Sequence, residues 1–390
     1  MAVLDINQVR ACFPSLKSGY IYAENAGGSQ TAQAVIDRIV DYLTNTNVQL
    51  GAGYSVGLLS SQRVADGSIA AAELFNAASL DEVGFGPSST MIFENIARAL
   101  DNDIQPGDEF IITYEHEANN GPWKYLAARR NVVVKYWKPT PVSADNPYSV
   151  AYKVEELLPL VSSRTRLAAI SACSNILGSL IPVEEAVKAL RQRAREQGAK
   201  KVEVQMDVQK WDIDYCAFSL YKMYGTHNAA FYVRSAAMQT SLTSIAHHFL
   251  TGDDKPHKLQ PGGPGYELVY GATGVHPSTR IANHEQELLA PLLLFLTDAK
   301  QFDRGVRIVG TSEIDLSRVP TISFSKDVAG AFDKKGGIGI RHGHCYAYSL
   351  IDNLHPKLDV NDGVVRISLV HYNTVEEVEK IVDVLREVLA

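Results

Sequence analysis

The chain has 390 residues, with 37 Lys and Arg against 44 Asp and Glu and a formal net charge of -7. This acidic balance argues against nucleic acid or an anionic membrane surface as a partner, because either would need a basic face. Hydrophobic residues make up 46% of the sequence and charged residues 21%, as in a packed soluble protein. Because the length exceeds the usual limit of one hydrophobic core, we expect two domains that share a cleft.

The first residues carry no basic patch followed by an apolar run, so a secretory signal is not expected. The most apolar stretch, residues 288–296, is too short to span a bilayer, which takes about 20 residues. No paired spacing that would indicate a disulfide scaffold or a zinc ribbon is found among Cys12, Cys173, Cys216 and Cys345. We therefore predict a cytoplasmic protein without a membrane segment.

From residue 81 to 233, short β-branched runs alternate with longer segments of helical period. Buried strands are expected at 110–113, 131–134, 167–171 and 229–233, and helices at 93–100, 123–130 and 183–196. This alternation is typical of a mostly parallel sheet with helices on both faces, which binds ligands beyond the carboxyl ends of its strands.

Glycine and proline punctuate residues 251–274, and the pattern then changes. A helix is expected at 281–300, followed by a smaller α+β unit. Its strands are expected at 306–309, 321–324 and 364–368, and Thr374 is expected to cap a closing amphipathic helix that reaches residue 389.

A lysine follows a short predicted strand in the segment Ala217-Phe218-Ser219-Leu220-Tyr221-Lys222-Met223-Tyr224-Gly225. In the interior of an α/β domain, burial lowers the pKa of an amine and makes the amine a nucleophile. The alternative is a strand-end lysine whose charged head lies in water.

Two further segments follow predicted strands. Hydroxyls and free N–H groups at Ser88-Ser89-Thr90 suit an anion at a helix start, although the same residues are ordinary N-caps. Asn175 offers an amide at the sheet edge, with a turn-forming asparagine as the alternative. His342, His344 and Cys345 are metal-like residue types, but they stand too close in sequence for one ion, and no metal is predicted.

Together these segments resemble the class V aminotransferases, and within them the cysteine desulfurase-like branch of pyridoxal-phosphate enzymes. The resemblance covers nearly the whole chain, and its further motifs are Tyr20-Ile21-Tyr22-Ala23-Glu24-Asn25-Ala26, Pro106-Gly107-Asp108-Glu109, Arg341-His342-Gly343-His344, Arg366-Ile367-Ser368-Leu369 and Tyr372-Asn373-Thr374.

The resemblance implies an α/β fold of type I among pyridoxal-phosphate-dependent transferases, with a mostly parallel sheet of the seven-stranded type. It also implies three parts: an N-terminal segment at 1–30, a large cofactor-binding domain at 31–280 and a small α+β domain at 281–390. A homodimer is the expected assembly.

The resemblance further assigns roles to residues. Lys222 matches the lysine that links to the aldehyde of pyridoxal 5'-phosphate and moves the α-proton of an amino-acid substrate. The residues matching the phosphate site are Ser89, Thr90, Ser219 and Tyr221, and Asn175 matches the group near the phenolic oxygen of the cofactor. Arg366 matches the clamp of the substrate carboxylate, with a surface ion pair as its alternative, and Asn25 falls among the substrate-binding residues.

The sequence also departs from the family. In Glu115-His116-Glu117 the position over the pyridine ring is expected to fall on Glu117, where the family has histidine. The sulfur-accepting cysteine matches Tyr346, with Cys345 one residue early and its side chain expected to point elsewhere. The loop that reaches a neighbouring subunit's phosphate reads Pro261-Gly262-Gly263-Pro264-Gly265 and lacks a hydroxyl.

The largest departure lies between residues 199 and 218, where the chain is several residues short. The aspartate that would pair with the pyridine nitrogen has no clear counterpart, and Glu203, Asp207 or neither takes its place. We therefore expect an enzyme acting at Cα or Cβ of an amino acid, of lyase, epimerase or aminotransferase type, with sulfur transfer disfavoured. The alternative is an inactive homologue that acts as a binding or dimerisation module.

Overall fold

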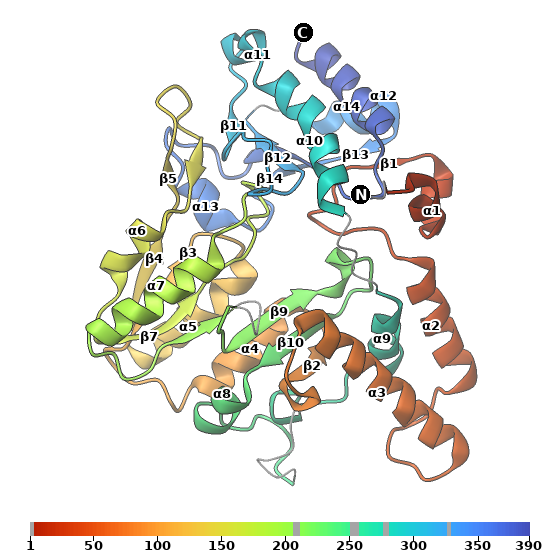
Figure 1. Ribbon diagram of the computed structural model, residues 1–390, viewed down its shortest axis with the longest axis vertical. Helices are drawn as coiled ribbons and strands as arrows, with labels where there is room; N and C mark the ends of the chain where they lie inside the picture. Colours follow the sequence, from red (N-terminus) through yellow and green to blue (C-terminus); the bar gives the residue numbers. More distant parts are fainter. Residues whose placement is uncertain (1–3, 206–210, 250–256, 276–280, 326–328) are drawn as a thin grey trace.

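The computed structural model describes residues 4–205, 211–249, 257–275, 281–325 and 329–390. Its main sheet has seven strands in the order β2-β10-β9-β8-β7-β3-β4 (Figure 1). Their bounds are β2 (Val83–Gly86), β3 (Glu109–Thr113), β4 (Val133–Trp137), β7 (Thr165–Ala169), β8 (Glu203–Gln205), β9 (Tyr215–Ser219) and β10 (Ala229–Val233). Neighbours pair in parallel except at β10, which is antiparallel to both β2 and β9. This confirms the predicted mostly parallel sheet.

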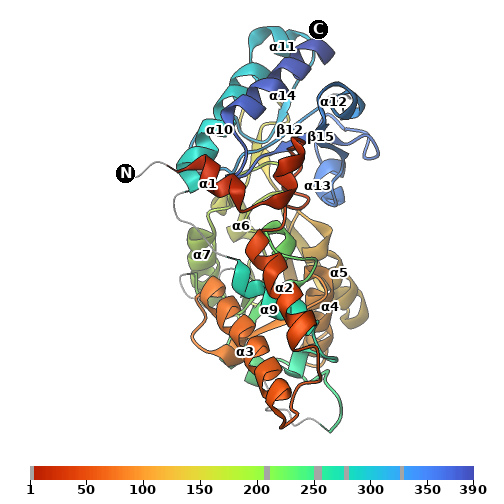
Figure 2. The same cartoon turned by 90° about the vertical axis from the view of Figure 1, so that its right-hand side faces the viewer.

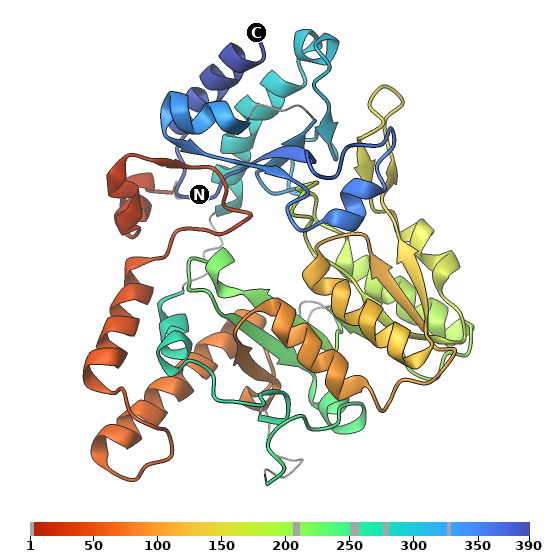
Figure 3. The ribbon, with the colours of Figure 1, turned by 180° about the vertical axis from the view of Figure 1, so that it is seen from behind.

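Helices cover both faces of this sheet because successive strand residues point to opposite sides. Phe110 and Ile112 pack with the helices α4 (Ser89–Leu100) and α5 (Gly121–Arg130), which lie in front of the sheet in Figure 3. Ile111, on the other face, belongs to the core that contains residues of α3 (Ser55–Phe75) and α7 (Val183–Glu196), seen in front in Figure 1. The sheet is therefore buried on both faces, as its near-continuous apolar strands predict.

A smaller α+β unit follows in the chain. Its four-stranded antiparallel sheet has the order β11-β12-β15-β14, with bounds β11 (Ile308–Val309), β12 (Thr321–Phe324), β14 (Arg341–Gly343) and β15 (Val364–Ser368). The helices of this part of the chain are α10 (Ile281–Leu296), α11 (Ala299–Asp303), α12 (Ala329–Gly336), α13 (Tyr348–Asp352) and α14 (Val375–Val388). The expected helix at 281–300 ends at Leu296, and the side chain of Asp298 caps α11.

The start of the chain packs onto this smaller unit. The strand β1 (Ile21–Tyr22) pairs in parallel with β13 (Ile338–Gly339), and Ile21 belongs to the hydrophobic core of the smaller unit. The chain then continues into α2 (Gln33–Asn45) and α3, which Figure 2 shows beside the large sheet. Shorter elements are α1 (Ile6–Ala11), β5 (Thr140–Pro141), β6 (Val150–Ala151), α6 (Val154–Leu157), α8 (Ser235–Thr240) and α9 (Tyr266–Gly271). Within the described ranges, no helix combines the length and apolar character needed to cross a bilayer.

Candidate functional site

Loops from several strands of the large sheet meet at its carboxyl edge. Lys222 ends a 3-10 turn after β9, Asn175 lies in the loop after β7, and His116 follows β3. With Arg341 and Arg366 of the smaller unit they line one pocket, whose remaining walls are Ala26, Gly27, Tyr221, Cys345 and Tyr346. The pocket therefore lies at the edge of the sheet where the parallel-sheet rule predicts ligands, and residues of both units line it.

Lys222 is one of the residues that line this pocket. Solvent reaches its side chain, yet protein atoms surround it on most sides, as expected for a group inside a cleft. Burial lowers the pKa of Lys222, and the nearby Arg366 cation acts in the same direction. No carboxylate of the described residues forms an ion pair with this amine. The lowered pKa makes the neutral, nucleophilic amine more abundant than in a lysine that lies fully in water.

His116, not Glu117, faces the pocket. The Nδ1 atom of His116 accepts a hydrogen bond from the Ala118 N–H at 3.1 Å, and burial lowers its pKa to about 3, with Lys222 acting in the same direction. The Glu117 carboxylate instead accepts from the Ser349 hydroxyl at 2.6 Å and pairs with Lys124 at 3.3 Å. The expectation that Glu117 covers the ring is therefore corrected, because the 3-10 turn at Glu117–Asn119 directs this carboxylate toward α13.

Asn175 and Arg366 meet on one side of the pocket. The Arg366 guanidinium is only 1% exposed and donates from Nη1 to the Asn175 carbonyl at 3.2 Å. The Asn175 amide donates to the Cys345 carbonyl at 2.8 Å, while its Oδ1 is buried without a hydrogen-bond partner. Both side chains thus keep hydrogen-bonding capacity toward the pocket, and Arg366 is not a surface ion pair.

The predicted phosphate residues gather at the start of α4. The hydroxyls of Ser89 and Ser219 are 2.8 Å apart, which joins the α4 N-terminus to the end of β9. Ser88 caps the helix by accepting from the Met91 N–H, and Thr90 is exposed in the first turn. Tyr221 lines the pocket and stacks on His227 with ring centroids 5.1 Å apart.

Asn25 serves the fold rather than the pocket. Its buried amide donates to the carbonyls of Tyr22 at 2.8 Å and Ser368 at 2.9 Å, and its oxygen accepts from the Tyr372 hydroxyl. These bonds tie the N-terminal segment to β15 and occupy the groups that a substrate would need. The prediction that Asn25 is a substrate-binding residue is therefore corrected. Its neighbours Ala26 and Gly27 line the pocket, and Asn25 does not.

Cys345 and Tyr346 both line the pocket, although strand-like alternation predicts that only one would. Both have positive φ angles, 46° and 62°, so the alternation of an extended strand does not hold here. Burial raises the pKa of Cys345, which keeps its sulfur a thiol. A thiol is a weak nucleophile, so the geometry brings sulfur to the site without activating it.

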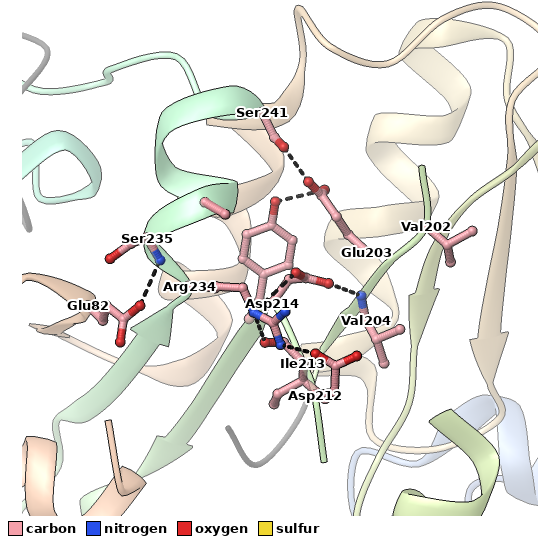
Figure 4. Close-up of polar contacts among 12 residues, drawn as sticks. Glu82, Val202, Glu203, Val204, Asp212, Ile213, Asp214, Arg234, Ser235 and Ser241 are labelled. Carbon is pink, nitrogen blue, oxygen red and sulfur yellow. Dashed lines mark hydrogen bonds and ion pairs between the residues drawn. The ribbon is translucent and has the colours of Figure 1, made fainter. Parts of the chain in front are cut away.

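Glu203 lies at the opposite edge of the sheet. It begins β8, and its buried carboxylate accepts a hydrogen bond from the Ser241 hydroxyl (Figure 4). The same carboxylate accepts from the Tyr215 hydroxyl at 2.7 Å and pairs with Arg166 at 2.9 Å. This position rules it out as the acid beneath a cofactor at the carboxyl edge. Asp207, the other acid considered, lies outside the described residues.

Sequence reasoning missed the roles of two charged residues. Arg341 was noted only as part of a motif, yet its guanidinium lines the pocket and pairs with Glu24 at 3.0 Å. The one signal in the sequence was Glu24 at the acidic position of the opening loop motif, and it does not identify Arg341 as the partner. No group of three or more His, Cys, Asp or Glu side chains able to hold a metal ion occurs in the described part of the chain.

Comparisons with known proteins agree with this geometry. The aminotransferase class-V family profile matches residues 21–381. The chain is 37% identical to the aminotransferase-like protein FGM3 of Gibberella zeae, over 98% of each chain, and 29% identical to the cysteine desulfurase-like protein ustD of Aspergillus flavus, over 99% of this chain and 91% of that one. A cysteine desulfurase of Thermococcus onnurineus NA1 has the same fold, with a TM-score of 0.83 at 22% identity over 100% of this chain and 99% of that chain. The chain therefore belongs to the class V aminotransferase family of pyridoxal-phosphate-dependent enzymes.

Proposed function

We propose that this chain binds pyridoxal 5'-phosphate through Lys222 and acts at Cα or Cβ of an amino acid. The observation that carries the proposal is the position of Lys222 in one pocket with Arg366, where burial lowers the pKa of its amine. Such an amine reacts with an aldehyde, and a buried guanidinium binds a carboxylate with two parallel hydrogen bonds.

Residues of the pocket and of the α4 N-terminus, which is not part of the pocket lining, fit the cofactor. The unpartnered Oδ1 of Asn175 suits a hydroxyl donor, and the paired hydroxyls of Ser89 and Ser219 at a helix N-terminus suit a phosphate. The neutral His116 ring provides a flat surface without adding charge. When bound, the cofactor supplies an electron sink for negative charge that develops at the substrate carbon.

The remaining work falls to side chains of this chain. Arg366 binds and orients the α-carboxylate of the amino acid, and its burial strengthens that contact. We assign to the Nζ atom of Lys222 the uptake and return of the proton at Cα. His116 and Tyr346, whose rings stack with centroids 5.7 Å apart, exclude water from one side.

For the acid beside the pyridine nitrogen, we propose Asp207. Glu203 is held at the other edge of the sheet, and Asp207 follows the last residue of β8 by two positions in sequence. Asp207→Asn is expected to weaken cofactor binding, measured by absorbance titration. Glu203→Gln is the control: its expected effect is a lower unfolding temperature with an unchanged cofactor spectrum.

The reaction we propose is of lyase, epimerase or aminotransferase type rather than sulfur transfer. The support is Cys345, whose burial keeps it a thiol, and Tyr346 at the position of the expected sulfur acceptor.

The shortened segment before β9 favours a second function, that of an inactive binding or dimerisation module. We further propose a homodimer in the cytosol, since the four cysteines are not joined in disulfides and large apolar side chains are exposed on α2 and α3.

One experiment tests the cofactor site. The purified protein is mixed with pyridoxal phosphate, its visible spectrum is recorded before and after borohydride reduction, and the reduced adduct is mapped by peptide analysis. We expect a new absorption band and a label on Lys222, both lost in Lys222→Ala and kept in Lys188→Ala, a control at an exposed lysine of α7. A label scattered over surface lysines would sink the proposal, and a specific label without turnover of any amino acid would favour the inactive module.

A further inference from the structure

Two arginines of the pocket converge on a single carboxylate. Arg341 of β14 and Arg366 of β15 are direct partners in the antiparallel pairing, so their side chains point to the same face of the small sheet. The Oε1 atom of Glu24 lies 3.0 Å from Nη1 of Arg341 and 3.7 Å from Nη2 of Arg366. One carboxylate oxygen therefore serves two guanidinium groups.

This arrangement leaves positive charge uncompensated. Like charges directly opposite each other on paired strands repel, and Glu24 is the only acid of the described residues that forms an ion pair with either arginine. The Nε atom of Arg366 is buried without a hydrogen-bond partner. Since each guanidinium can hold a carboxylate with two parallel hydrogen bonds, the pair has room for more anionic oxygens than Glu24 provides.

Glu24 is placed so that it can give way. Its side chain is 37% exposed, whereas that of Arg366 is 2% exposed and cannot follow it out. Gly27 keeps this corner open, because a Cβ at that position would lie 2.5 Å from the Glu24 Oε1 and 3.3 Å from Arg366 Nη2. A ligand carboxylate can thus occupy the space between the arginines when the Glu24 side chain turns into solvent.

We propose that the substrate is a short dicarboxylic amino acid, such as aspartate, whose α-carboxylate binds Arg366 and whose side-chain carboxylate binds Arg341 in place of Glu24. This rests on the proposed function of the same pocket. The two carboxylates of such a substrate balance the charges of the two arginines. An amino acid with a neutral side chain has no group for Arg341, which then stays paired with Glu24. The diacid must be short because both guanidinium groups reach within 3.7 Å of one oxygen.

Succinate tests this without relying on the lysine chemistry, since it has two carboxylates and no amine. Its binding to the protein, incubated with pyridoxal phosphate, is compared by calorimetry with that of succinamate, which replaces one carboxylate by an amide. We expect succinate to bind at least about tenfold more tightly. Arg341→Gln should remove this preference and leave succinamate binding unchanged, while Arg386→Gln, at an exposed arginine of α14, keeps the wild-type preference.

A second variant examines the displaced side chain. Glu24→Gln removes the resident charge, so succinate should bind to it at least as tightly as to the wild type. Equal affinities for succinate and succinamate in the wild type, or an Arg341→Gln variant that weakens both alike, would overturn the inference. A specific label on Lys222 without a diacid preference leaves the proposed function standing and removes only this inference. A diacid preference without the label would overturn the proposed function, and with it the substrate role, and leave only a diacid-binding site.

Discussion

Glu115 connects two loops that build the pocket. It precedes His116, and its buried carboxyl group accepts a hydrogen bond at 2.8 Å from the hydroxyl of Ser174, the residue before Asn175. Burial raises the pKa of Glu115 to about 8, and its Oε1 has no hydrogen-bond partner. The neutral acid therefore holds the two loops together at neutral pH.

This makes stability depend on pH in a defined direction. The Glu115 pKa rises from 4.5 to about 8 on folding, so between these values the folded state binds a proton that the unfolded state has lost. The free energy of unfolding therefore falls as pH rises through this window, by up to about 1.4 kcal/mol per pH unit for this group. Glu115→Gln, which keeps the acceptor for Ser174, should flatten that slope in urea unfolding measured from pH 5 to 8. An unchanged slope would contradict the assignment.

The His116 ring should act through its shape rather than through its charge. Because burial lowers its pKa to about 3, it stays neutral at working pH, and Phe can replace its flat surface. We expect His116→Phe to retain cofactor affinity within about threefold and His116→Ala to lose about tenfold, the range of an aromatic stacking contact. Absorbance titration measures both, with His342→Ala as an exposed control. Equal losses in the Phe and Ala variants would argue against stacking.

At the scale of elements, apolar period and capping residues predicted most of the fold. The structure places β10, β12, β15 and α7 at the predicted bounds, because each is a continuous buried run or an amphipathic face that only one element satisfies. The strand β8 escaped prediction, since it is short and begins with Glu203, whose charge is compensated only by tertiary partners.

Some residues of the pocket could be predicted from the sequence, and others could not. Residues directly after strands, such as Lys222 and Asn175, follow from topology. The choice between His116 and Glu117 does not, because it depends on where a short turn leaves each side chain. The convergence of Glu24 with Arg341 likewise requires the pairing of β1 with β13, which no local pattern contains.

The closing helix α14 provides a test at this scale. Thr374 caps it by accepting from the Glu377 N–H at 3.2 Å, and the Glu377 carboxylate accepts from the Thr374 N–H at 3.3 Å, forming a capping box. Thr374→Ala should lower the free energy of unfolding by about 1 kcal/mol. Chemical denaturation measures this against Thr44→Ala, an exposed site within α2 where no loss is expected. A loss of the same size at both sites would mean that the cap contributes nothing specific.

For the whole molecule, α2 and α3 present an apolar surface to solvent. They are joined by an Arg63–Asp41 ion pair at 2.6 Å, yet Val40, Leu43, Leu58 and Leu59 are 56%, 49%, 60% and 47% exposed. Figure 2 faces these helices. Exposed apolar side chains on neighbouring helices are typical of a surface that another subunit covers.

We therefore expect a dimer in sedimentation experiments, and its disruption by the pair Leu43→Glu and Leu58→Glu. Two buried charges at an interface cost several kcal/mol, so the dissociation constant should rise by about a hundredfold or more. Leu316→Glu, at a loop position that is 64% exposed, is the matched control and should leave the assembly unchanged. A wild-type monomer, or an unaffected double variant, would show that this surface is not the interface.

The ion pair between Glu24 and Arg341 joins residues 317 positions apart in the chain. During synthesis, the N-terminal segment leaves the ribosome long before β13 and β14 exist to receive it. The large sheet can assemble first, because its strands lie closer together in sequence. The cluster of Glu24, Arg341 and Arg366 forms only when nearly the complete chain has been made. A truncated nascent chain could thus carry a folded sheet and the lysine while lacking any means to hold a substrate.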